Sequence, residues 1–364
     1  MKIFVLNRGS SNIKCSLYEF KDLPEVPVEP IWQAQGNNED LTKIIKTVSK
    51  QDIDVIGHRI VHGGKFFQGS VIIDQKVKEK IGSLAELAPL HNFSELESIE
   101  TLEKIFPNIP QIAIFDTVFH QTLQNASKIY PGPYKWFEEG IQRYGFHGIS
   151  FQYCSKRAAQ ILNKELNSLK MVVCHLGSGA SLCAIQDSKS IDTTMGFTPL
   201  EGLMMNTRSG TIDPGIILYL LEKKQLTAQE IAKQLYEDSG LLGISGNNVF
   251  IDIIEKSQQG DVRSTLALEI YLHRLNSLIG SMIASLQGID ALVFTAGIGE
   301  NVPWIREKVC ECFSFLGMKI DRSKNASPGS EDCLISDPYS KIKVLLIHTK
   351  EAFEIAKECW KLLH

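Results

Sequence analysis

The chain has 364 residues, of which 43% are apolar and 22% are charged, and its formal net charge is −4 at neutral pH. This length predicts about two domains, and the composition predicts a globular protein with a large core, not a disordered or fibrous one. The slightly acidic balance argues against a nucleic-acid or membrane-surface binder, because such proteins carry a concentrated basic excess.

The chain start, MKIFVLNRGSS, reaches Asn7 and Arg8 too soon for the apolar region of a secretory signal peptide. No apolar stretch of the sequence approaches the length of a membrane-spanning helix. The 8 cysteines are scattered without a CxxC pair, which favours core thiols in a reducing compartment over disulfides. These features predict a soluble, cytoplasmic protein.

Two segments of the chain resemble each other in register. Residues 2–13 read KIFVLNRGSSNI and residues 170–181 read KMVVCHLGSGAS. Each joins an apolar run to a second apolar run through a Gly/Ser turn, as in a β-hairpin whose turn exposes backbone N–H groups. The long period indicates a duplicated domain instead of a solenoid repeat, with chance similarity of two hairpins as the alternative.

The rest of the chain alternates between strand and helix patterns, which predicts an α/β architecture. Short apolar runs typical of buried strands occur at 54–61, 70–74, 111–115, 291–295 and 343–347. A helix is predicted after Asn92, where Glu95 would complete a capping box. A second is predicted over 262–286, which is apolar nearly all round and would therefore lie buried between layers. A third is predicted to start at Asn301 with Pro303 and to end at Gly317. Residues 323–333 are predicted to form a surface loop.

Three glycine turns follow apolar runs, at 7–14, 175–181 and 296–301, while P-loop, complete GxGxxG, GxSxG and protein-kinase motifs are absent from the sequence. Such turns can direct backbone N–H groups at anionic oxygens, and Lys14 could add a charge. A single turn of this kind is ambiguous, but three together favour phosphate binding. The segments APLHN, FDTVFH, YGFHG and MGFTPLEG each set a polar group among apolar residues, which indicates a largely apolar ligand pocket.

Several polar residues carry open alternatives. His58 and His62 have the spacing of a helical metal pair, but the GHRIVHGG context favours a strand, which separates them and argues against zinc. Arg59 beside the Gly-Gly break can reach an anionic ligand. Arg208 precedes a helix predicted near Pro214 and could bind an anion or form a salt bridge with Asp213 or Glu201. For magnesium, composition does not choose among Asp116, Glu300 and Glu351.

The same segments, taken in order, resemble the acetate kinases. The shared strings are NxGSS (7–11) with Lys14, GHRxVHGG (57–64), APLHN (88–92), FDTxFHQ (115–121), YGFHG (144–148), HLGxG (175–179), MGFTPLEG (195–202), TRxGxIDP (207–214) and FTAGIGEN (294–301). The resemblance implies two duplicated actin-like (ribonuclease H-like) α/β domains with a cleft between them. It places the N-terminal domain at 1–118 plus 353–364 and the nucleotide-binding domain at 119–352.

The resemblance further implies a cytoplasmic homodimer that transfers the γ-phosphoryl group of ATP to acetate with Mg²⁺ or Mn²⁺. The implied catalytic residues are Arg59, Asp116, His147 and Arg208. The substrate would contact Asn7, Arg59, Val61, Leu90, Phe146 and Pro199, and the metal would be held through Asn7 and Glu351. The nucleotide would contact Lys14, His175, Leu176, Gly177, Ser178, Gly179, Val249, Phe250, Ile251, Gly297, Ile298, Gly299, Glu300 and Asn301. A propionate or butyrate kinase and a non-catalytic sensor on the same fold are the alternatives.

This chain departs from the family pattern at several positions. Arg8 stands where the family has alanine, Asn12 where it has serine, and Ser178 where it has asparagine. Lys350 replaces the asparagine before the implied metal glutamate, and Val249-Phe250-Ile251 replaces an Asp-Phe-Arg run beside the adenine. The departures leave the implied catalytic set intact and fall mainly on the nucleotide side.

Overall fold

Two six-stranded sheets, one from each half of the chain, form the frame of the protein. The computed structural model describes residues 1–9, 12–37, 40–48, 51–85 and 92–364. The first sheet contains β1 (Lys2–Arg8), β2 (Asn12–Glu19), β3 (Trp32–Asn37), β4 (Val55–Ile60), β5 (Val71–Ile72) and β6 (Gln111–Phe115). The second contains β7 (Met171–Leu176), β8 (Ala180–Gln186), β9 (Lys189–Thr193), β10 (Ala291–Thr295), β11 (Cys333–Leu334) and β12 (Lys343–Leu346).

The two sheets have the same topology. Their strand orders are β3-β2-β1-β4-β6-β5 and, read in the same sense, β9-β8-β7-β10-β12-β11. In each, the first three strands pair antiparallel, the next two pairs are parallel, and the last pair is antiparallel. The two matching sequence segments lie in the equivalent hairpins β1–β2 and β7–β8. The duplication predicted from the sequence is therefore confirmed.

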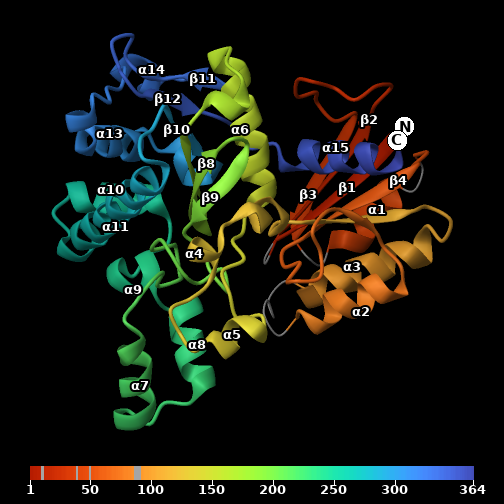
Figure 1. Cartoon of the computed structure of the whole chain (residues 1–364), viewed down its shortest axis with the longest axis horizontal. Helices are drawn as coiled ribbons and strands as arrows, with labels where there is room; N and C mark the ends of the chain where they lie inside the picture. The colour runs from red at the N-terminus through yellow and green to blue at the C-terminus, as the bar shows by residue number, and fades with distance from the viewer. Residues whose placement is uncertain (10–11, 38–39, 49–50, 86–91) are drawn as a thin grey trace.

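Helices cover the sheets and join the two halves (Figure 1). They are α1 (Leu41–Val48), α2 (Gln75–Ser83), α3 (Asn92–Ile105), α4 (Asn125–Lys128), α5 (Tyr134–Glu138), α6 (Gly148–Leu162), α7 (Pro214–Lys223), α8 (Ala228–Tyr236), α9 (Gly240–Ser245), α10 (Phe250–Gln258), α11 (Val262–Leu286), α12 (Ala296–Asn301), α13 (Pro303–Cys312), α14 (Arg322–Ala326) and α15 (Glu351–Leu363). The helices α6 and α15 pack on each other between the sheets. One apolar cluster runs from Val5 through Phe151 and Phe353 to Val173, so the halves share a core.

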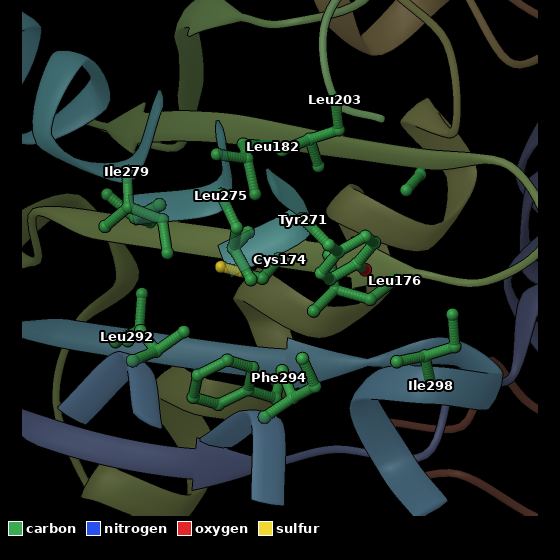
Figure 2. Packing of buried hydrophobic residues seen from close by; sticks show 14 of the residues in the cluster. Cys174, Leu176, Leu182, Leu203, Tyr271, Leu275, Ile279, Leu292, Phe294 and Ile298 are labelled. Atoms are coloured by element: carbon green, nitrogen blue, oxygen red, sulfur yellow. The ribbon is translucent and has the colours of Figure 1, made fainter. Parts of the chain in front are cut away.

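Helix α11 packs one face on the second sheet. Figure 2 shows Leu275 and Ile279 of this helix among side chains of β8 and β10, such as Leu182 and Phe294. The prediction that the helix lies buried between layers is wrong, because Val262 is 78% exposed and its outer face meets solvent. Apolar residues on all sides of a helix do not require that all sides be covered.

Three further predictions need correction. Asn301 ends α12, and the next helix, α13, begins at Pro303 and ends at Cys312 before a 3₁₀ turn leads to Gly317. The segment 296–301, predicted as a turn, is helical. The predicted loop 323–333 contains most of α14. In each case the glycine or proline marks a break between short elements that local patterns do not resolve. Within the described part of the chain, no helix is long and apolar enough to cross a membrane.

Candidate active site

The ends of three adjacent strands of the first sheet bring together three predicted site residues. Asn7 lies near the end of β1, Arg59 near the end of β4, and Asp116 directly after β6. These strands run parallel in the order β1-β4-β6, so their carboxyl ends meet at one edge of the sheet. Ligands of open α/β sheets bind at this edge.

Hydrogen bonds join these side chains into one network with Glu351, the first residue of α15. Arg59 donates from Nε and Nη2 to Asp116 Oδ2, at 3.0 and 2.5 Å, and from Nη1 to Asn7 Oδ1 at 3.3 Å. Asn7 in turn donates from Nδ2 to Glu351 Oε2 at 2.8 Å. The second oxygen of Asp116 is buried and has no partner among the described residues. The network therefore fixes the Arg59 guanidinium while leaving acceptor capacity on Asp116.

The electrostatics of this network follow from its burial. Burial acts against the Arg59 charge, but Asp116, Glu351 and Glu95 outweigh it and raise the pKa of Arg59. Burial raises the pKa of Asp116, and Arg59 opposes that shift. For Glu351, burial is outweighed by Arg59 and His175, and its pKa is lowered. Arg59 thus stays charged among carboxylates, which suits a group that receives further anions.

His147 is the N-cap residue of α6 and lies beside this network. Its backbone lies in the left-handed region, with φ of 59°, a strained position of the kind that clusters at functional sites. Gly148 follows it, and its N–H donates to the carbonyl of Asp116 at 2.9 Å. A Cβ at Gly148 would lie 2.2 Å from that carbonyl oxygen, so the close approach requires glycine. The YGFHG segment is therefore tied directly to Asp116.

Arg208 and His147 face each other across Gly179 in the β7–β8 turn. A Cβ built on Gly179 would lie 3.5 Å from Arg208 Nη1 and 3.6 Å from His147 Nε2. His147 Nδ1 is 2.8 Å from the hydroxyl of Ser181, and its ring stacks on His175 at 4.1 Å. When the Ser181 hydroxyl donates to Nδ1, the neutral ring keeps its proton on Nε2, on the side of Gly179. A small cradle with two donors results.

The protonation states in the cradle suit an anion. Burial, followed by the charge of His175 and of Arg59 and Arg208, holds the pKa of His147 well below its usual value. The ring is therefore neutral at pH 7 and acts as a hydrogen-bond donor. Arg208 donates to the carbonyl of Pro199 at 3.2 Å and, among the described residues, forms no salt bridge. The predicted alternative pairing with Glu201 is wrong, because Glu201 pairs with Arg143 at 2.6 Å.

Three of the residues expected to line an acyl pocket are buried near these groups. Val61 and Phe146 belong to one apolar cluster, and Pro199, whose carbonyl accepts from Arg208, is also buried. Leu90, the fourth residue expected there, lies outside the described residues. His62, which was weighed as a zinc ligand, instead packs edge-on against Phe146. His58 lies in β4 and contacts Gln111, so the two histidines do not form a pair.

The predicted nucleotide residues fall into two groups. His175 and Leu176 end β7, and residues 177–179 form the β7–β8 turn, where a Cβ at Gly177 would touch Ala296 at the start of α12. Gly297, Ile298 and Gly299 are thus beside that turn. The Glu300 carboxylate is already engaged by the N–H groups of Ala296 and Thr349, at 2.7 and 3.0 Å, and Asn301 donates to Gly297 O. These two side chains support α12 itself.

The second group lies at the start of α10, apart from the hydrogen-bonded network. Phe250 is buried against Tyr271 of α11, whereas Val249 and Ile251 are 49% and 52% exposed. The side chains of these two exposed residues can pack against a ligand but cannot hydrogen-bond it.

A magnesium ion fits the donor set at Asn7 and Glu351. These residues border a cavity of about 520 Å³ that is also lined by Lys14. Mg²⁺ favours one or two carboxylates completed by phosphate oxygens and water. Within the described residues no cluster of three or more His, Cys, Asp or Glu side chains could hold a metal ion. The charge of Lys350 is directed away from Glu351, because it pairs with Glu29 at 2.6 Å.

Three residues around the site were missed or misread from the sequence. Ser181 orients His147, and Ser150 contacts His175 Nδ1 at 2.9 Å. Ser181 ends the repeated segment 170–181 and Ser150 follows YGFHG by two residues, and this proximity to the motifs was the available signal. Glu95 is not part of a capping box: its carboxylate lies against the N–H of Val61 at 3.2 Å, and Asn92 Oδ1 has no partner among the described residues.

Comparison with known proteins identifies the family. The model of the Acetokinase family matches residues 33–357. The acetate kinase of Trichormus variabilis is 47% identical, with 100% of both chains covered. The structure superposes on a Porphyromonas gingivalis acetate kinase (35% identity, TM-score 0.88, 100% of both chains) and on a Francisella tularensis propionate kinase (37%, 0.88, 98% of both). The chain belongs to the Acetokinase family.

Proposed function

We propose that this protein is an acetate kinase that transfers the γ-phosphoryl group of ATP to acetate, giving acetyl phosphate and ADP. The observation that carries the proposal is the convergence of Arg208 and His147 on Gly179, facing the network that holds Arg59. Two cations and a neutral hydrogen-bond donor suit the charge of a transferring phosphoryl group.

The reaction needs no general base, because acetate is already ionised at neutral pH. One acetate oxygen forms a bond to the γ-phosphorus as the bond to the β–γ bridging oxygen breaks, and ADP leaves. Asp116 holds Arg59 toward the acetate carboxylate, and Arg208 and His147 Nε2 donate to the phosphoryl oxygens. A magnesium ion at Asn7 and Glu351 would neutralise charge on the phosphates.

We further propose that the chain forms two domains, the first made of residues 1–118 plus 353–364 and the second of residues 119–352.

The acyl pocket should distinguish substrates by one methylene. Val61 is bulky and buried, so propionate should lose about 1–3 kcal/mol in kcat/KM relative to acetate, and Val61→Ala should shift the preference toward propionate. A coupled assay of ADP formation with acetate, propionate and butyrate, with and without Mg²⁺, tests this and the function together. A wild-type preference for propionate would favour the other kinase, and no turnover with any acid would favour a sensor.

Donor choice should be broad. Val249 and Ile251 cannot hydrogen-bond a base, so we expect GTP to be used within about tenfold of ATP, a difference of roughly 1.4 kcal/mol. The measurement is kcat/KM for ATP, GTP, ITP and pyrophosphate at saturating acetate and Mg²⁺. An ATP preference above about a hundredfold would contradict this and assign base recognition to other groups, such as the backbone at Gly297.

We propose further that the protein is a cytoplasmic homodimer. Helix α7 exposes Ile216, Leu218, Tyr219 and Leu221 (38–59% exposed), an apolar surface of the kind that marks protein interfaces. Leu218→Glu should convert the dimer to a monomer in sedimentation velocity, whereas a monomeric wild type would reject the proposal. All eight cysteines are free, as is usual in a reducing compartment, and cell fractionation tests the location.

A further inference from the structure

Glu95 is a buried carboxylate beside the acyl pocket that the reaction, as described, does not use. Its side chain comes from the first turn of α3 and is 2% exposed. Both carboxylate oxygens lie 3.2 Å from the backbone N of Val61. Val61 follows the last residue of β4 and is itself buried, so this N–H has left the strand ladder and depends on Glu95 for its acceptor.

Charged groups from three other elements face Glu95: Arg59 of β4, Asp116 after β6, and Arg8 of β1. Arg8 is 8% exposed and fixes the helix on both sides of Glu95. Its Nη1 donates to Ser94 O at 2.6 Å and to Ser98 Oγ at 2.7 Å, and it pairs with Glu97 at 3.3 Å. Arg8 stands where the family pattern has alanine, so these contacts of Arg8 with α3 are particular to this protein.

We propose that Glu95 is a positioning residue of the acyl pocket. By accepting from the N–H of Val61, it fixes the backbone of that residue. It thereby sets the depth of the pocket and the position of the end of β4, the strand that carries Arg59. This rests on the proposed function, since the pocket is defined by its acid substrate. A displaced Val61 changes the fit of the methyl group, while the contacts at the β7–β8 turn and α12 remain.

Ionisation of Glu95 should make the KM for acetate depend on pH. Burial raises the pKa of Glu95 to about 8, against the opposing effects of Arg59 and the N–H of Val61. Above that pH an added negative charge lies beside Arg59, so acetate should bind less tightly. The KM for acetate should therefore rise as the pH passes through 8, and this rise should be absent when residue 95 cannot ionise.

The test compares Glu95→Gln and Glu95→Ala with the wild type and with Glu100→Ala, an exposed position on the same helix. KM and kcat for acetate, propionate and ATP are measured from pH 6 to 9. We expect Glu95→Ala to raise the acetate KM about tenfold and to narrow the acetate-to-propionate preference, with the ATP KM unchanged. Glu95→Gln, which keeps an acceptor for Val61, should restore the acetate KM at pH 7 and remove its rise above pH 8.

Two results would overturn the proposal: an unchanged acetate KM and selectivity in Glu95→Ala, or equal losses for acetate and ATP. If Glu95→Ala does not fold, Glu95→Gln decides alone, because a pH profile identical to the wild type would reject the role. The proposed function is judged separately by the wild type. If the wild type turns over acetate and the Glu95 variants behave like it, only the role of Glu95 is rejected. If the wild type does not turn over acetate, the acetate kinase proposal itself is rejected.

Discussion

Replacing Arg208 with alanine is expected to lower kcat by about 10³-fold, the scale of an arginine that contacts a transferring phosphoryl group. The fold should survive, because Arg208 forms no ion pair within the described part of the chain and donates only to Pro199 O and Met205 Sδ. Burial lowers the pKa of Arg208, so the charged guanidinium is already unfavourable in the free enzyme. Removing this side chain leaves no buried carboxylate without its partner. The measurement is kcat with saturating acetate and ATP, together with the melting temperature.

Arg59→Ala should lose a similar factor in kcat but also lose stability. Its side chain is 13% exposed and its partner Asp116 is 1% exposed, so the substitution strands a buried carboxylate, at a cost of about 3–5 kcal/mol. The double variant Arg59→Ala/Asp116→Asn should recover stability without recovering turnover. Arg322→Ala, at an ion pair that is 76% exposed on the arginine side, is the matched control and should change neither. Near-normal turnover in folded Arg208→Ala and in the double variant would contradict the mechanism.

The place of a candidate site residue in the fold was predictable where it follows from the local order of residues along the chain. Asn7 and Asp116 each follow an apolar run that predicts a strand, Arg59 lies near the end of another such run, and the parallel strands carry all three to one edge. The likeness of the two glycine turns predicted the duplication of the hairpin, which the two sheets confirm. The meeting of these three residues at one sheet edge follows from local patterns, whereas their roles in the reaction are implied by the family resemblance and stay a prediction.

The parts that failed depend on contacts between distant segments. Glu95 has the spacing of a capping box with Asn92, yet its carboxylate accepts from the buried N–H of Val61 instead, because leaving that donor unpaired would be costly. Arg59 lies near the end of its strand as predicted, but the carboxylates of α15 and of the segment after β6 that surround it come from distant segments and could not be read from its local sequence. Glu300 looked like a ligand in a glycine turn and instead holds the N–H groups of its own short helix and of Thr349.

Replacing Gly179 with alanine is expected to lower kcat by about 10²-fold or more, the cost of losing a donor contact to transition-state charge. The added methyl group would lie at ordinary contact distance from Arg208 Nη1 and His147 Nε2, 3.5 and 3.6 Å, so the free enzyme can accept it. It nevertheless occupies the space between the two donors, where a phosphoryl oxygen would need to approach both within about 3 Å.

Gly280→Ala in α11 is the control for this variant, because a Cβ there meets no atom within 4 Å. It should raise stability by about 0.5–1 kcal/mol, as for alanine in a helix, and leave kcat unchanged. The decisive comparison is kcat and the ATP KM of both variants, measured at a temperature below both melting temperatures. An unchanged kcat in folded Gly179→Ala would show that the phosphoryl group does not pass between Arg208 and His147. A raised ATP KM with normal kcat would instead assign the β7–β8 turn to the phosphates that stay on the nucleotide, since only contacts formed in the transition state change kcat.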